Sequence, residues 1–237
     1  MRKAIIVFFI SICTLGANGL FKDFRTDILK INGNQATIKN SKDIVIGSSG
    51  IVIHKFDNKT SSIIARVDVV NKSGESATLR FHTYRSLKQS ALPIPGIAPK
   101  VGDEVILNYL YDRSLIVAPN YKIYNEITKH FKNITWVHPD ITGTYLAEHT
   151  RPNPDRKIFQ TMCKQNVASL IFFALNNEAV FVDCNNFKIV KKLKGGRVRR
   201  AQLPFYTRIK GIDTSWFDFG SHKMDSYSNY YKRLIHK

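Results

Sequence analysis

The sequence predicts an α+β protein in which a small antiparallel β-barrel or sandwich precedes a small α/β layer. Short runs of β-branched and aromatic residues, separated by turn residues, occupy residues 26–119. Helical and strand patterns then alternate over residues 120–190. We therefore expect a β-rich domain at 20–119, an α/β domain at 120–190, and a C-terminal segment at 191–237 that contains a basic turn and a terminal helix.

In the β-rich part, turn signals such as Asn32-Gly33-Asn34 and Ser73-Gly74 separate the predicted strands. The spacing of these signals is typical of hairpin-connected antiparallel sheets. The predicted strands are Ala36–Ile38, Ile44–Ile46, Gly50–His54, Ser62–Val70, Ala77–Tyr84, Val105–Tyr111 and Ser114–Ala118.

The α/β part shows helical spacing in three stretches and apolar strand patterns in three others. The Asn176-Asn177-Glu178 turn between two of the strands indicates a hairpin. We expect helices at Tyr121–Phe131, Ile141–His149 and Asp155–Gln165, strands at Ile134–Val137, Val167–Leu175 and Ala179–Cys184, and an amphipathic terminal helix at Asp225–His236.

Residues 1–19 have the layout of a secretory signal peptide. Arg2 and Lys3 form a basic start, an apolar run follows, and Ala17 to Gly19 supplies small residues for cleavage. An uncleaved anchor helix would need about 18 apolar residues, more than this run offers. We therefore expect an exported protein whose mature chain begins near Leu20.

The charge balance is strongly basic. The chain has 36 Lys and Arg against 18 Asp and Glu, a net charge of +18, and loss of the leader lowers this to about +16. In a cytoplasmic protein such an excess would suggest nucleic acid. For an exported protein we expect no nucleic-acid partner, and anionic envelope lipid, acidic glycan or carboxylate-lined pockets of host proteins become the candidate partners.

One segment concentrates this charge. Residues 191–200 read KKLKGGRVRR, which predicts an exposed basic turn between two ordered parts. We interpret it as an electrostatic patch formed by Lys191, Lys192, Lys194, Arg197, Arg199 and Arg200.

Cys163 and Cys184 are the two cysteines outside the leader. An even pair in an exported chain favours a disulfide or two buried thiols. A zinc site is disfavoured because neither a C-x-x-C pair nor a nearby histidine accompanies them. A bridge requires the helix that carries Cys163 to pack against the strand that ends at Cys184.

The residues with the strongest resemblance to a catalytic pair are His138 and Asp140, which follow a predicted strand. No G-x-S-x-G elbow, H-E-x-x-H helix, glycine-rich phosphate loop or close carboxylate pair accompanies them. We therefore expect Asp140 to cap the next helix and His138 to hydrogen-bond locally. The sequence predicts a protein that is not an enzyme, with no catalytic residues, cofactor or metal.

Five long segments resemble the plasminogen-binding surface proteins of epsilonproteobacteria, and together they cover most of the expected mature chain. They are Gly47–Ala65, Gln89–Pro119, Asn133–Asp140, Leu170–Cys184 and Gln202–Phe217. The resemblance implies a shared domain and plasminogen as a host partner. In this family, activity is attributed to lysines at the extreme carboxyl end of a long Lys- and Glu-rich tail, and the sequence ends without such a tail.

What the resemblance carries over is the last residue, Lys237. Plasminogen's kringle pockets pair an ammonium with carboxylates, pack aromatic rings on the alkyl stem, and place cations against a free carboxylate. A C-terminal lysine meets all three requirements, so Lys237 is the candidate ligand-binding residue. The terminal helix would hold it either in solvent or too close to the protein body for a pocket to reach.

Two functions remain open. The first is a surface protein that recruits plasminogen through Lys237, with the basic segment adding attraction. The second is a periplasmic or envelope-associated structural protein whose basic surface contacts anionic lipid or glycan.

Overall fold

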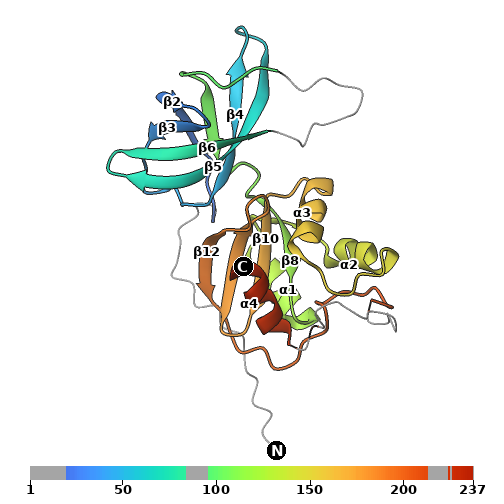
Figure 1. Ribbon diagram of the computed structural model, residues 1–237. Helices are drawn as coiled ribbons and strands as arrows, with labels where there is room; N and C mark the ends of the chain where they lie inside the picture. The colour runs from blue at the N-terminus through green and yellow to red at the C-terminus, as the bar shows by residue number, and fades with distance from the viewer. Residues whose placement is uncertain (1–19, 84–95, 213–223, 225, 237) are drawn as a thin grey trace, which may run out of the picture. The chain divides into compact units, whose positions relative to one another are not determined.

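The computed structural model describes residues 20–83, 96–212, 224 and 226–236 (Figure 1). It divides the chain into two compact units, one of them Phe21–Tyr111 and the other beginning at Asp112. The expected signal peptide at 1–19 and the candidate residue Lys237 lie outside the described residues.

The first unit is a curled, seven-stranded antiparallel sheet (Figure 1). Its strands follow the order β1-β7-β4-β5-β6-β3-β2, and every pair is antiparallel. They are β1 (Phe24–Asp27), β2 (Lys30–Asn32), β3 (Gln35–Lys39), β4 (Ser49–Lys55), β5 (Ser61–Ser73), β6 (Ser76–Thr83) and β7 (Glu104–Leu107).

Alternating side chains build the core of this sheet. Ile38, Val52, Val67 and Leu79 are fully buried, whereas their strand neighbours are more exposed in β3 and β6. The hairpin between β5 and β6 turns at Gly74, whose φ of +53° is unfavourable for residues with a side chain. The glycine turn signal of the sequence therefore marks a real hairpin.

The second unit contains a five-stranded mixed sheet in the order β12-β11-β10-β8-β9. β10 and β9 run parallel to β8, and the β10-β11-β12 pairs are antiparallel. The strands are β8 (Arg113–Val117), β9 (Thr135–Val137), β10 (Leu170–Leu175), β11 (Glu178–Asp183) and β12 (Ile189–Lys194); the helices are α1 (Tyr121–His130), α2 (Pro139–Glu148), α3 (Arg156–Gln165) and α4 (Tyr227–His236).

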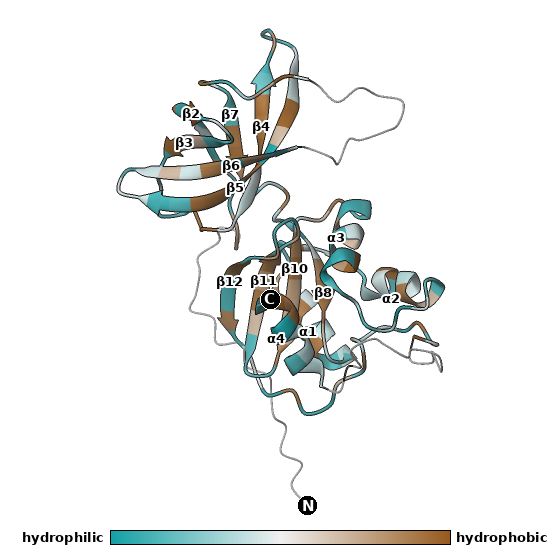
Figure 2. Ribbon diagram, viewed as in Figure 1, coloured by the Kyte–Doolittle hydropathy of each residue, from teal (hydrophilic) through white to brown (hydrophobic). Residues whose placement is uncertain are grey.

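Helices cover both faces of this sheet. On one face, buried residues of α2, α3 and α4 pack with the strands in a single core cluster. On the other, Phe131 at the end of α1 packs on Phe172 and Phe181, with ring centroids 5.8 and 5.7 Å away. Burial on both sides explains why β10 is apolar at every position, and Figure 2 shows the contrast with the hydrophilic stretch of β12.

The α+β class is confirmed, with a curled antiparallel sheet followed by an α/β layer. Some expected elements differ from the structure. Residues Ile44–Ile46 lie in the loop before β4 rather than in a strand, and the sequence does not predict β1 and β2. The stretch Ser114–Ala118, expected in the first domain, forms most of β8 and lies at the centre of the second sheet, because it pairs with both β9 and β10.

The expected separate C-terminal segment is also different. Lys191, Lys192 and Lys194 are not in a turn but in β12, which pairs with β11. The terminal helix is present as α4, and its buried Tyr227 and Tyr231 belong to the same core as α2 and α3. Both elements are therefore integral parts of the second unit.

Candidate binding site

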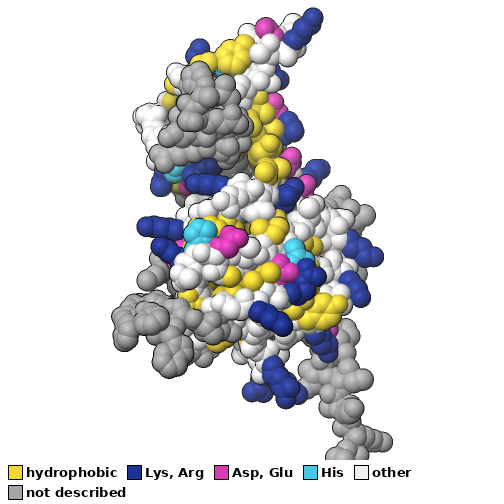
Figure 3. All heavy atoms as spheres, turned by 90° about the vertical axis from the view of Figure 1, so that its right-hand side faces the viewer, with side chains coloured by type: hydrophobic (Ala, Val, Ile, Leu, Met, Phe, Trp, Pro, Cys, Tyr) yellow, Lys and Arg dark blue, Asp and Glu magenta, His cyan; other side chains and the backbone are white. Residues whose placement is uncertain are grey.

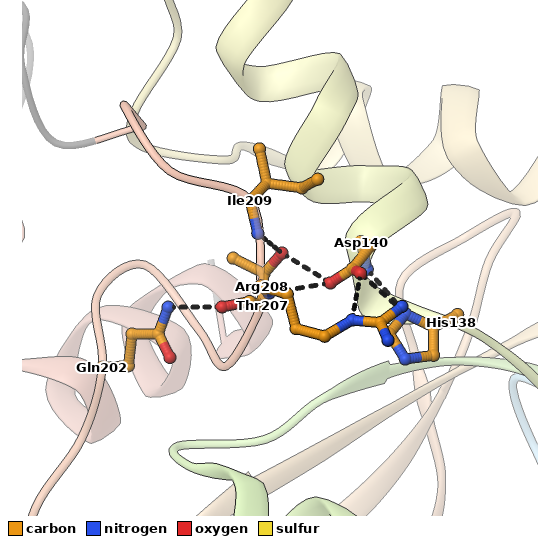
Figure 4. A network of polar contacts seen from close by, with 6 residues as sticks. All are labelled: His138, Asp140, Gln202, Thr207, Arg208 and Ile209. Atoms are coloured by element: carbon orange, nitrogen blue, oxygen red, sulfur yellow. Dashed lines mark hydrogen bonds and ion pairs between the residues drawn. The ribbon is translucent and has the colours of Figure 1, made fainter.

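A polar network joins the start of α2 to the segment 202–209 (Figure 4). The Asp140 carboxylate accepts hydrogen bonds from the Thr207 hydroxyl at 2.9 Å and from the Arg208 backbone N–H at 2.8 Å. It also accepts one from Arg208 Nε at 2.6 Å. The Asp140 carboxylate thus holds the Thr207 side chain and both the backbone and the side chain of Arg208. These two residues lie 67 and 68 positions further along the chain.

The cap of α2 differs from the expected one. His138, not Asp140, is the N-cap residue, and its Nδ1 accepts from the Asp140 backbone N–H at 3.2 Å. Pro139 occupies the first turn, where a missing N–H costs no helical hydrogen bond. The Asp140 side chain is thereby left to bind the distant segment. His138 and Asp140, the candidate catalytic pair of the sequence, thus have structural roles here: His138 caps α2, and Asp140 binds the segment 202–209.

The electrostatics of the network agree with this role. Burial alone would raise the pKa of Asp140, but hydrogen bonds from the Arg208 backbone, the Arg208 guanidinium and Thr207 outweigh it and lower the pKa. The hydrogen bond to Asp140 raises the pKa of Arg208 in turn. The carboxylate is held ionised by its partners, which suits an anchor rather than a general base.

Gly143 allows the segment to approach α2 closely. A Cβ at this position would lie 2.6 Å from Thr207 Oγ1 and 3.3 Å from Thr207 Cβ. Gln202 Nε2 donates to the Thr207 carbonyl at 2.7 Å, which closes the segment on itself. Thr207 is consequently almost completely buried, at 4% exposure.

Fixing this segment places Tyr206 in an aromatic cluster at the surface of α1. Its ring lies 5.6 Å from that of Tyr121 and 5.3 Å from that of Tyr124. The Tyr124 ring also lies 5.5 Å from His138. Tyr121 is 60% exposed, so the cluster borders solvent. Burial, with a smaller contribution from Tyr206, raises the pKa of Tyr124 and keeps its phenol protonated.

The six predicted patch residues occupy one edge of the second sheet and the segment that follows it. Lys192, Lys194, Arg197, Arg199 and Arg200 are exposed, and Lys191 is half-buried. Among the described residues, none of the six forms an ion pair. On the face shown in Figure 3, Lys and Arg side chains are spread over the surface rather than gathered in one patch.

A disulfide joins Cys163 on α3 to Cys184 directly after β11, with a Cα–Cα distance of 6.2 Å. Both residues are buried in the core cluster of the second unit. The packing of α3 on the sheet thus provides the proximity that a bridge requires.

Sequence reasoning missed the segment Tyr206–Ile209 as a partner of His138 and Asp140. These residues belong to two separate sequence blocks, NITWVHPD and QLPFYTRIKGIDTSWF, and no local pattern links the two blocks. The only signal in the sequence is an aspartate in the first turn of a predicted helix. An aspartate at that position is equally typical of a residue that caps the helix.

No group of metal-ligating side chains suitable for an ion occurs in the described part of the chain. The helices described there are all too short or too polar to cross a membrane.

These features define a two-unit α+β protein with a basic surface, in which Asp140 links the start of α2 to the segment 202–209. The chain belongs to the family described as "Plasminogen-binding protein pgbA N-terminal", whose model matches residues 23–235. The expected family resemblance is therefore confirmed. The family is described by a binding function and not by a catalytic one.

Two curated relatives from Helicobacter pylori carry the name Plasminogen-binding protein PgbA. The chain is 26% identical to the protein of strain J99 and 25% identical to that of strain 26695, over 199 residues in each case. The matches cover 82% of this chain and 43% of each relative, so the chain spans less than half of their length. No solved structure matches the chain.

Proposed function

We propose that the protein is exported and binds host plasminogen at the cell surface, with Lys237 as the contact residue. The observation that carries the proposal is the family match over nearly the whole described chain, together with relatives named for plasminogen binding. The basic composition supports it because kringle pockets that accept lysine are lined by carboxylates.

The geometry of α4 limits how such a contact forms. Tyr231 and Ile235 anchor the helix in the core almost to its end, and α4 ends at His236. A pocket that accepts Lys237 would meet the exposed Arg233 and His236 side chains near the end of α4. Charge around the helix end then contributes to the encounter.

The test is plasminogen binding by the purified chain from Leu20 onward in physiological salt. Deletion of Lys237 is expected to abolish binding, and free lysine analogues are expected to compete. An added alanine after Lys237 is the matched control, because it keeps the ammonium but moves the terminal carboxylate. Equal binding by all three proteins would overturn the Lys237 mechanism while leaving plasminogen binding in place; no binding by any would overturn both.

The exposed basic segment 191–200 favours a second candidate function, an envelope-associated role with anionic lipid or glycan as the partner. Such binding is expected to weaken steadily as ionic strength rises, and free lysine analogues are not expected to compete with it. Protease accessibility of the protein on intact cells separates the two functions, since a protein confined to the periplasm is protected and cannot meet plasminogen.

A further inference from the structure

We propose that the outer edge of β12 binds an extended acidic peptide as an additional strand. β12 is the last strand of its sheet and, within the described residues, pairs only with β11. An edge strand presents a row of N–H and C=O groups that another extended chain can pair with. This inference does not depend on plasminogen binding or on Lys237.

The register shows which backbone groups form the open edge. The N–H of Gly195, directly after β12, donates to the carbonyl of Asn177, directly before β11, at 3.1 Å, so the N–H of residue 195 points toward the β11 side. Because the direction of backbone groups alternates along a strand, Leu193 also faces β11. The N–H and C=O groups of Lys192 and Lys194 therefore point away from the sheet.

The same two residues carry exposed ammonium groups. Lys192 lies opposite Val180 and Lys194 opposite Glu178, which places both lysine side chains on one face of the sheet. Glu178 is already paired with Lys232 on α4, at 2.9 Å. Neither Lys192 nor Lys194 has an ion-pair partner in the described chain.

Charge decides what kind of strand this edge accepts. A second copy of the chain would bring lysines against lysines, and like charges on paired strands are destabilising. A peptide with acidic side chains at alternate positions would instead place carboxylates beside Lys192 and Lys194. Arg197, Arg199 and Arg200 continue the basic surface beyond the strand. Main-chain hydrogen bonds would supply affinity, and the lysines would supply selectivity.

The test compares two fluorescent peptides of about eight residues, measured by anisotropy with the purified chain. One alternates Glu with Val and Thr; the other has the same sequence and charge, but each Glu is N-methylated. The Glu residues opposite Lys192 and Lys194 are those whose N–H groups face β12, and a residue without an N–H cannot donate to a strand ladder, so only the first peptide forms a complete added strand. We expect it to bind about tenfold more tightly.

Two substitutions separate backbone pairing from charge. Lys192→Gln removes the charge alone, whereas Lys192→Pro also removes the outward N–H, a change that edge strands tolerate. We expect Lys192→Pro to bind the first peptide about tenfold more weakly than Lys192→Gln. Lys122→Gln, an exposed lysine on α1, makes the same charge change and is expected to bind like the unmodified chain.

Hydrogen exchange of the unmodified chain keeps the test independent of variant folding. The first peptide is expected to slow exchange at the Lys192 and Lys194 amides and not at Lys122. Equal affinity for the two peptides would show attraction by charge alone and overturn the proposal. If neither peptide binds, Lys192 and Lys194 serve only to prevent other strands from pairing with this edge, and the proposal is overturned.

Discussion

Arg156 on α3 closes the end of α4 by donating from its Nε to the Leu234 carbonyl at 2.7 Å. A second bond runs from its NH2 group to the Ile235 carbonyl at 3.0 Å. The last carbonyls of a helix have no partner within the helix, and a cation there also complements the helix dipole. The guanidinium lies 5.1 Å from the centroid of the Phe187 ring. One side chain thus links α3, α4 and the turn after β11.

Replacing Arg156 with alanine is expected to lower the free energy of unfolding by about 2 kcal/mol, because two charge-assisted hydrogen bonds are lost. Amide hydrogen exchange at residues 233–236 should become faster. Chemical denaturation and exchange measurements check the two effects. Lys157→Ala, at the exposed neighbouring position of α3, is the control and should leave both unchanged. Matching results for the two variants would contradict the role assigned to Arg156.

Asp140→Asn is expected to loosen the segment 204–209 and to reduce stability by about 1–2 kcal/mol, through weaker bonds to the Thr207 hydroxyl and the Arg208 backbone. Limited proteolysis should then cut near Arg208 faster in the Asp140 variant than in the unmodified chain. Glu148→Gln, an exposed position on the same helix, is the matched control. An uncut segment in the Asp140 variant would show that packing alone holds it.

The stability difference between the unmodified chain and Asp140→Asn should depend on pH in a defined direction. Hydrogen bonds from Arg208 and Thr207 lower the folded-state pKa of Asp140, despite the opposing effect of burial. The carboxylate therefore stabilises the fold fully above the unfolded-state pKa of about 3.9, and this contribution disappears as pH falls through the lower folded-state pKa. Denaturant titrations of both proteins at several acidic pH values check it; a difference that grows on acidification would refute the assignment.

Local sequence patterns predicted those elements whose own residues determine them. The helix expected at Asp155–Gln165 is present as α3, and the structure shows Asp155 capping it, since this side chain accepts from the Ile158 N–H at 2.8 Å. The β10-β11 hairpin was likewise visible, because two apolar runs flank Asn177, which adopts a φ of +65°. Both features depend on residues close in sequence.

Long-range pairing was not predictable in the same way. The apolar run of β8 fits either sheet, and its parallel pairing with β9 and with Leu170–Phe173 of β10 assigns it to the second. β12 was interpreted as a turn because its lysines dominate its composition, although an edge strand can carry exposed charge. The Asp140–Arg208 bond spans 68 residues, and no local pattern encodes such a contact.

Gly143→Ala is expected to destabilise the protein, although alanine favours helices by about 1 kcal/mol over glycine. The new Cβ would lie 2.6 Å from Thr207 Oγ1, and the hydroxyl cannot easily move because it donates to Asp140. Overpacking of this kind costs about 1–3 kcal/mol. Thr144→Ala, at the exposed adjacent position, should gain helix propensity without a clash. Thermal unfolding of the two variants should therefore shift in opposite directions.

The double variant Gly143→Ala with Thr207→Ala tests the cause. Removing the hydroxyl leaves the Thr207 Cβ as the nearest atom of that side chain, at 3.3 Å. The combined loss of stability should be smaller than the sum of the single losses, because the two positions share one contact. Additive losses would place the cost of the Gly143 substitution elsewhere.

Removal of the Cys163–Cys184 disulfide is expected to lower stability by about 3 kcal/mol, mainly because the bridge restricts the unfolded chain between residues 21 positions apart. Cys163→Ala with Cys184→Ala should unfold at lower denaturant concentration than the oxidised chain. Dithiothreitol should lower the midpoint of the unmodified chain and leave the double variant unaffected, which separates the bridge from general effects of the reductant. Since both cysteines are buried beside α3 and β11, a native chain that resists dithiothreitol until it unfolds would agree with the packing. A double variant as stable as the oxidised chain would show that core packing alone determines the stability of this unit.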